Sequence, residues 1–368
     1  MTGKILNYYA GGNTARGFHN LFTSNLNGLD RLFILKGGPG TGKSTLMKAV
    51  GEKWNNEGYD IEYIHCASDN GSIDGVIIRE LGIGIVDGTS PHVIEPKAPG
   101  AVEEYVNLGE AWDSKKLTNK KEAILKITDS ISADYQKAYA TFHEALLIHD
   151  EWEEIYIMNM NYEKANEITD ELMHQFFSKK VNKAANVYHR FLGAATPKGA
   201  VDFVPNLTEG LEKRYFIKGR PGSGKSTVLK KLAANAEASG YDVEIYHCGF
   251  DPNSLDMVIV RELGFAIFDS TAPHEYFPER EGDYIIDMYE KTIKKGTDEK
   301  FFDNLKEISG RYSKKMKEAI GYLADAKSKH DDLEKIYIAA MNFSKIDKIH
   351  KKVDQEIEKL TSAQQQKY

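Results

Sequence analysis

The chain has 368 residues, which is long for one domain and sufficient for two, and its 41% hydrophobic and 28% charged residues are ordinary for a soluble globular protein. No apolar run approaches the roughly 18 residues of a membrane span, and the first residues lack a signal peptide's apolar core, so we expect a cytoplasmic protein without a membrane partner. The net charge of −7 supplies no basic field for nucleic acid and disfavours that class of partner.

In chain order, the first half alternates short apolar runs with glycine-rich turns, a pattern typical of an α/β domain. The run Arg31–Lys36 leads directly into glycines, which predicts a buried strand entering a tight loop. Ser72 is a candidate N-cap for a short helix that ends at Gly82. The expected elements are strands at residues 4–10, 31–36, 60–66 and 83–87, a helix from Ser44 to about Asn56, and the short helix at 72–82.

The pattern changes after about residue 101. Lysine and glutamate dominate, strand patterns are absent, and apolar residues recur at helical spacing as far as residue 180. We expect a helical appendage there, whose aromatic side chains serve in packing. The same change begins near residue 283 and continues to the end of the chain.

The second half repeats the first at an offset of 182 residues. Gly37–Ser44 and Gly219–Ser226 are near-identical, and the same offset relates the strands expected at 83–87 and 265–269. In the appendages, residues 149–157 match residues 330–338. The expected domains are residues 1–183, with a helical appendage at about 101–180, and residues 184–368, with a helical appendage at about 283–368.

Both glycine-rich octapeptides fit the Walker A pattern, GxxxxGK followed by Ser or Thr, between a predicted strand and a predicted helix. In such a loop, backbone N–H groups and the helix N-terminus bind phosphate oxygens. Lys43 and Lys225 are expected to reach the β- and γ-phosphates. The expected nucleotide-binding residues are Gly37, Gly38, Pro39, Gly40, Thr41, Gly42, Lys43, Ser44 and Thr45 in the first copy, and Gly219, Arg220, Pro221, Gly222, Ser223, Gly224, Lys225, Ser226 and Thr227 in the second.

Asp87 and Asp269 are candidate Walker B residues because each ends an apolar strand that follows a P-loop. A carboxylate at that place can hold a magnesium-bound water, and a simple Asx turn is the alternative. No glutamate directly follows either aspartate, so the usual base of additional-strand ATPases is missing from its usual place. The expected magnesium ligands are Ser44, Asp87, Ser226 and Asp269.

The segment Asp-x-Thr-x-Pro-His follows each of these strands. Proline restricts the preceding residue to extended geometry, so the loop is suited to hold His92 or His274 beside the γ-phosphate. A histidine there can orient water or take a proton, and capping of backbone groups in a tight turn is the alternative. The candidate catalytic residues are Lys43, Asp87, His92, Lys225, Asp269 and His274.

Cysteine and arginine positions complete the candidate sites. Cys66 and Cys248 each follow a histidine at a strand end and form no CxxC pair, which argues against a zinc site and favours a buried strand-end pair over a reactive thiol. Arg220 replaces Gly38 in the second loop, so we expect the two sites to be inequivalent.

With these motifs the chain resembles the P-loop NTPase superfamily. Asn7–Gly17, Leu35–Ser44, His65-Cys66 and Asp87–His92 resemble a bacterial family of tandem P-loop proteins described as ATPase-like or nucleotide-kinase-like. The resemblance implies an α/β fold of two tandem P-loop NTPase domains, each a mostly parallel sheet flanked by helices and followed by a helical appendage. No guanine-reading Asn/Thr-Lys-x-Asp motif is present, which favours ATP over GTP.

We therefore expect a protein that binds ATP and Mg²⁺ at two sites per chain. The first functional hypothesis is slow ATP hydrolysis. The second is phosphoryl transfer to a small acceptor, with the helical appendages as a lid. The third is a non-catalytic scaffold whose appendages contact a partner protein.

Overall fold

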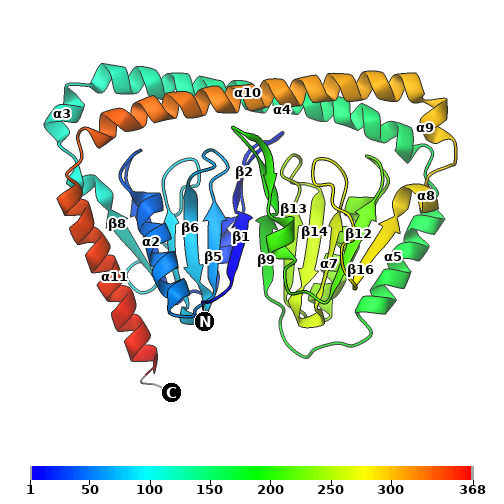
Figure 1. Ribbon diagram of the computed structural model, residues 1–368, viewed down its shortest axis with the longest axis horizontal. Helices are drawn as coiled ribbons and strands as arrows, with labels where there is room; N and C mark the ends of the chain where they lie inside the picture. Colours follow the sequence, from blue (N-terminus) through cyan, green and yellow to red (C-terminus); the bar gives the residue numbers. More distant parts are fainter. Residues whose placement is uncertain (1, 366–368) are drawn as a thin grey trace. The chain divides into compact units, whose positions relative to one another are not determined.

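The computed structural model describes residues 2–365, which form two compact units (Figure 1). Unit 1 comprises Met1–Gly11, Leu26–Gln136 and Tyr322–Tyr368, and unit 2 comprises Gly12–Asn25 and Lys137–Gly321. Each unit contains one α/β core with one of the two glycine-rich loops.

The sheet of unit 1 has six strands in the order β1-β5-β6-β7-β4-β8. Strand β6 is antiparallel to both neighbours, and the other pairings are parallel. The bounds are β1 Ile5–Tyr9, β4 Arg31–Lys36, β5 Ile61–His65, β6 Ile73–Ile78, β7 Ile83–Asp87 and β8 Glu103–Asn107, with the short helices η1 Arg79–Leu81, η2 Leu108–Ala111 and α3 Ser114–Thr118.

Helix α2 (Lys43–Asn56) packs on β5, β6 and β7, and helix α11 (Phe343–Gln365) shares the core that α2 forms with the sheet. Lys53 of α2 also contacts Asp354 of α11 at 2.8 Å. The apolar side chains that join the two helices to this core include Leu46, Met47, Val50 and Trp54 of α2 and Ile346, Val353 and Ile357 of α11.

Unit 2 repeats this architecture with the strand order β9-β13-β14-β15-β12-β16, in which β14 is the antiparallel strand. Helix α7 (Lys225–Ala238) packs on the sheet, and α5 (Tyr162–Phe176) packs on α7. The strands are β9 Val187–Phe191, β12 Lys213–Lys218, β13 Val243–His247, β14 Leu255–Val260, β15 Phe265–Asp269 and β16 Asp283–Asp287.

The remaining elements are hairpins, short helices and two long helices. The strand pairs β2–β3 and β10–β11 form separate two-stranded sheets. The long helices α4 and α10 have 37 residues each. The bounds are β2 Gly11–Thr14, β3 Gly17–Asn20, α1 Phe22–Leu26, α4 Lys121–Ile157, β10 Gly193–Thr196, β11 Gly199–Asp202, α6 Val204–Leu207, η3 Arg261–Leu263, α8 Met288–Thr292, α9 Thr297–Lys300 and α10 Phe302–Ile338.

The expected α/β class is confirmed, and so are the strands expected at 4–10, 31–36, 60–66 and 83–87 and the helix after the first glycine loop. The short helix expected at 72–82 is wrong, and so is its equivalent at the 182-residue offset, residues 254–264. Apart from the single turns η1 and η3, these segments form β6 and β14, which are buried along their whole length between two neighbouring strands. Asp74 and Gly75 interrupt the apolar run of β6, which made it resemble a turn and a helix start.

The expectation that strand patterns cease at 101 and 283 is also wrong. Strands β8 and β16 lie at 103–107 and 283–287, where each pairs with the strand that precedes the glycine-rich loop. Both are edge strands, paired with a neighbouring strand on one side. Three of the five residues of β8 are Glu or Asn. A short polar edge strand has no apolar alternation to identify it.

The compact units differ from the consecutive halves 1–183 and 184–368 that the duplication predicts. Residues 137–176, from the first appendage, belong to unit 2, and residues 322–365, from the second appendage, belong to unit 1. Each core is therefore covered by helices that come from the other sequence repeat. In the described part of the chain, no helix combines the length and apolar character that a membrane span requires.

Candidate functional site

Both glycine loops make a tight turn between a buried strand and a helix. Gly40 and Gly42 have φ of 67° and 86°, and the equivalent glycines of the second loop have φ of 72° and 82°. Residues with a Cβ atom disfavour this left-handed region, which explains the glycines at these positions. The Thr41 hydroxyl donates to the Gly38 carbonyl at 2.9 Å, and Ser223 makes the equivalent bond at 2.7 Å.

A lysine–aspartate pair lies beside each loop. The Lys43 ammonium donates to the Gly37 carbonyl at 2.8 Å, and its Nζ lies 3.4 Å from Asp87 Oδ2. In unit 2, Nζ of Lys225 lies 3.6 Å from Asp269 Oδ2. The pairs form because the strand that enters each loop is paired directly, in parallel, with the strand that ends in the aspartate.

The two oxygens of Asp87 have separate partners. Oδ1 accepts hydrogen bonds from the backbone N and the hydroxyl of Thr89, at 2.9 and 2.6 Å, while Oδ2 faces Lys43. Asp269 repeats this arrangement with Thr271. The Asx-type turn and the position beside the lysine therefore occur together, so the two interpretations of this aspartate are compatible.

The serine after each lysine lies at the start of the helix. The Ser44 hydroxyl accepts from the backbone N of Ile73 at 3.1 Å, and Ser226 accepts from Leu255 at 2.9 Å. Each serine is thereby attached to the first residue of the antiparallel strand, β6 or β14. The threonines that follow, Thr45 and Thr227, are exposed on the helices.

His92 is buried and His274 is partly buried, and each lies near a carboxylate. Nε2 of His92 lies 3.6 Å from Asp74 Oδ1, whereas Nδ1 of His274 lies 2.8 Å from Asp202 Oδ2. Burial by itself would lower the pKa of His274. The hydrogen bond to Asp202 and nearby carboxylate charge outweigh that effect, so its pKa is raised. The charge of Asp269 contributes to this rise, and the expected position of the histidines beside a γ-phosphate stays a prediction.

Asp74 and Asp256 are site residues that the sequence interpretation missed. They lie on β6 and β14 and are 5% and 7% exposed. Burial raises the pKa of Asp256 to about 6, and the charge of Asp269 adds to this effect, while His274 and Lys225 oppose it. Burial likewise raises the pKa of Asp74. The two aspartates are 182 residues apart, so the repeat offset was a signal that could have found them.

The two cysteines belong to the same clusters. Each thiol contacts the buried aspartate of its unit, Cys66 with Asp74 and Cys248 with Asp256. Burial raises the pKa of both thiols well above the usual range, which favours the neutral thiol. A reactive thiolate is therefore disfavoured at neutral pH.

A helix from the other sequence repeat covers each loop. A Cβ atom added to Gly40 would lie 2.7 Å from Cγ1 of Ile338 and 3.0 Å from Cγ of Glu334. In unit 2, a Cβ atom on Gly222 would lie 2.6 Å from the carbonyl oxygen of Glu153. The helices α10 and α4 thus leave no room for a side chain at these glycines.

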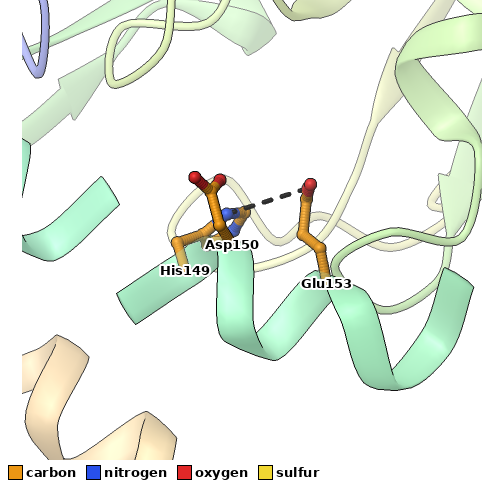
Figure 2. A group of neighbouring side chains, drawn as sticks. All are labelled: His149, Asp150 and Glu153. Carbon is orange, nitrogen blue, oxygen red and sulfur yellow. Dashed lines mark ion pairs between the residues drawn. The ribbon is translucent and has the colours of Figure 1, made fainter. Parts of the chain in front are cut away.

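The helix that covers the second loop carries the group His149, Asp150 and Glu153 (Figure 2). Nδ1 of His149 lies 3.7 Å from Oε1 of Glu153, one helical turn away. The Asp150 carboxylate lies close to both, since one ligand atom of each of the three residues lies within 4.8 Å of the others (Figure 2). Because Asp150 is exposed and Glu153 pairs with the histidine, we interpret this group as a histidine–carboxylate pair of the helix and not as a metal site.

Arg220 of the second loop is engaged within its own unit. Its guanidinium lies 3.0 Å from Asp298 Oδ2 and 4.8 Å from the ring centroid of Tyr289. A Cβ atom added to the equivalent Gly38 would lie 3.2 Å from both Trp112 and Tyr337, closer than most Cβ contacts. The first loop is therefore crowded at the position where the second loop has an arginine.

The structure therefore brings together, in each unit, the loop lysine, the strand-end aspartate, the serine and the loop histidine, and adds a buried aspartate from the antiparallel strand. These residues are Lys43, Ser44, Asp74, Asp87 and His92 in unit 1 and Lys225, Ser226, Asp256, Asp269 and His274 in unit 2. The chain has no significant match among protein-family models, curated proteins or solved structures.

Proposed function

We propose that the protein binds ATP with Mg²⁺ at two P-loops per chain and hydrolyses it. The observation that carries this proposal is the repeated geometry at the loops, in which the Walker A lysine lies within 3.4 or 3.6 Å of an aspartate that ends the adjacent parallel strand. Both repeats keep this lysine, serine and aspartate although other positions of the two repeats differ.

The arrangement suits a nucleoside triphosphate. Backbone N–H groups of the loop and the N-terminus of α2 or α7 favour phosphate oxygens, and the lysine ammonium adds a positive charge. Asp87 with Ser44, and Asp269 with Ser226, are hard oxygen donors of the kind that Mg²⁺ prefers, and Oδ1 of each aspartate is already fixed by a threonine. When bound, Mg²⁺ would neutralise charge on the phosphates.

Phosphoryl transfer to a small acceptor is the second candidate. The observation that favours it is the helix that covers each P-loop, because a covered site keeps water away from the γ-phosphate. The absence of a glutamate after Asp87 and Asp269 points in the same direction. An acceptor would then take the place of water as the nucleophile.

The test is phosphate release from ATP and Mg²⁺ by the purified protein, with and without nucleoside and nucleotide acceptors. Hydrolysis predicts release without an acceptor, and a kinase predicts ADP formation only when an acceptor is present. The double variant Lys43→Ala/Lys225→Ala is the negative control. The proposal is wrong if the wild type neither binds nor consumes ATP.

A further inference from the structure

The helices that cover the two loops carry the same histidine at the same place. His149 lies one turn before Glu153, whose backbone closely approaches Gly222, and His330 lies one turn before Glu334, whose side chain closely approaches Gly40. The neighbouring residues differ between the two helices: Leu333 stands at the position equivalent to Trp152. The histidine and the glutamate are therefore the same in both helices, although residues between them differ.

The surroundings of His149 come from four segments of unit 2. On its own helix, Asp150 and Glu153 lie beside it. From the loop after β13, Asp251 acts on it electrostatically and Phe250 lies against it, with ring centroids 6.0 Å apart; from α10, Tyr312 lies against it at 5.6 Å. From the P-loop, the charge of Lys225 reaches it.

His330 has charged neighbours of the same kind in unit 1, from its own helix and from the loop after β5. Glu334, Asp331 and Lys327 act on it from its own helix, and Asp69 acts on it from the loop after β5. Asp69 is the equivalent of Asp251 at the 182-residue offset. In both units, a histidine of the helix that covers the glycine loop therefore lies near the aspartate in the loop after β5 or β13.

The loop aspartate is paired with a cation in each unit, but the cation has a different origin. Arg16, in the turn of the β2–β3 hairpin, contacts Asp251 at 2.7 Å. Lys327, on α10 like His330, lies 3.5 Å from Asp69. The aspartate near each histidine is therefore paired with a cation in both units, although the cation comes from a different element.

Burial lowers the pKa of both histidines. Lys225 adds to the effect at His149 and Lys327 at His330, while the carboxylates beside each ring oppose it. Burial therefore favours the neutral form of both rings, in which one ring nitrogen can accept a proton. In unit 2, Nδ1 faces Glu153, which leaves Nε2 as the accepting atom.

We propose that His149 and His330 are the proton acceptors of the two nucleotide sites, each acting on the P-loop of the opposite sequence repeat. This inference rests on the proposed function. The oxygen of water, or of an acceptor hydroxyl, forms a bond to the γ-phosphorus, and the bond from that phosphorus to the β–γ bridging oxygen breaks. ADP leaves with the electron pair, and the proton of the nucleophile passes to the imidazole. In unit 2, Glu153 at 3.7 Å stabilises the imidazolium that forms.

The test uses two single-site proteins. In a Lys225→Ala chain, turnover comes from the first site, so His330→Asn should lower it about 10²-fold, within the usual range for general-base catalysis, whereas His149→Asn should leave it unchanged. In a Lys43→Ala chain the two results should be exchanged. His143→Asn, at an exposed position of α4, is the matched control and should have no effect in either chain.

Three further measurements separate a proton acceptor from a structural histidine. Binding of a non-hydrolysable ATP analogue should change less than about threefold in each histidine variant. The fall in turnover toward acid pH should disappear in the variant, and histidine NMR of the nucleotide-free wild type should give both rings a pKa below the ordinary 6.5. His→Gln variants serve where Asn variants do not fold.

Unchanged turnover in both histidine variants, or a pKa above 7 for both rings, would overturn this inference while leaving the nucleotide sites intact. If His149→Asn acts on the first site instead, the assignment of lid to loop is wrong. Loss of analogue binding by the wild type would instead reject the proposed function itself.

Discussion

The loop histidines of the two sites have different partners although the loops around them are nearly identical. His92 lies 3.6 Å from Asp74 through Nε2, whereas His274 lies 2.8 Å from Asp202 through Nδ1. Tyr276 also donates to Asp202, at 2.6 Å. In the second unit the histidine and its aspartate therefore form part of a hydrogen-bonded network.

The first repeat has no equivalent of that network. Asn20 stands where the second repeat has Asp202, and Ile94 stands where it has Tyr276. Asn20 also belongs to unit 2, whereas His92 belongs to unit 1. After duplication, the lysine–aspartate pair stayed the same and the groups that set the charge of the histidine diverged. A shared motif therefore does not give the two histidines the same neighbouring carboxylate.

The largest expected effect comes from the loop lysines. Lys43→Ala should abolish turnover at the first site and Lys225→Ala at the second. Removing the ammonium from a phosphate contact should cost at least ~1.5–3 kcal/mol, which weakens binding at that site by about 10- to 150-fold. Calorimetry with a non-hydrolysable analogue measures each site, with Lys126→Ala, at an exposed position, as the control. Equal losses at both sites from one substitution would show that the sites are not separable.

The strand-end aspartates come next. Asp87→Asn and Asp269→Asn should each retain nucleotide with a weakened dependence on Mg²⁺ and lose turnover on the order of 10²-fold at their own site, because one charge of the cation site is removed. Magnesium titrations of binding and turnover measure both effects. Unchanged kinetics in both variants would place the magnesium-site carboxylate elsewhere, with Asp74 and Asp256 as the nearest alternatives.

Asp202→Asn makes the second repeat resemble the first. The pKa of His274 is higher in the folded protein than the ordinary 6.5, so protonation of this histidine stabilises the fold. The stabilisation is complete below pH 6.5 and is lost as the pH rises through the pKa of the folded state. The lowered pKa of Asp202 stabilises it above 3.8, and this contribution is lost as the pH falls. The pair is therefore most stabilising between about pH 4 and 6.5, where the variant should lose about 1.5–3 kcal/mol.

Urea unfolding at pH 5.5 and pH 8 measures this difference, and the loss should be smaller at pH 8. Glu281→Gln, at an exposed position of unit 2, is the control. A loss that is the same at both pH values would mean that the pair contributes packing and a neutral hydrogen bond only.

Arg220→Gly gives the smallest expected change. The guanidinium is engaged by Asp298, so its contribution to phosphate binding is limited to what it supplies after leaving that pair. We expect the second site to bind nucleotide only a few-fold more weakly, because exposed ion pairs are worth about 0–1 kcal/mol. Two-site calorimetry measures the ratio of the affinities, with Asp298→Asn as the companion variant. A higher affinity after removal of Arg220 would contradict the prediction that Arg220 favours phosphate.

The strand–loop–helix segments around Lys43 and Lys225 could be predicted from sequence because local signals agree there. An apolar strand, a glycine loop and a helix follow each other without interruption, and Asp87 ends the next apolar run. Asp74 could not be placed in the same way. Its strand contains Asp and Gly, and the segment is a strand because it lies between two other strands, which is a tertiary effect.

The local sequence also does not predict that the helices of each appendage pack on the core of the other repeat. Because the two repeats are similar, the pattern of α5 or α11 fits either core, and the choice depends on where the long helices α4 and α10 lead. Sequence order alone therefore placed His149 in the first domain, whereas the structure places it in unit 2, where the charge of Lys225 acts on it.

The most direct test of the central claim is the number of nucleotides bound per chain. Equilibrium titration of the wild type with a non-hydrolysable ATP analogue and Mg²⁺ should approach two, and Lys43→Ala and Lys225→Ala should each approach one at concentrations that saturate the intact site. A wild-type protein that binds no nucleotide, or a stoichiometry of one that neither lysine substitution changes, would contradict the assignment of two P-loop sites.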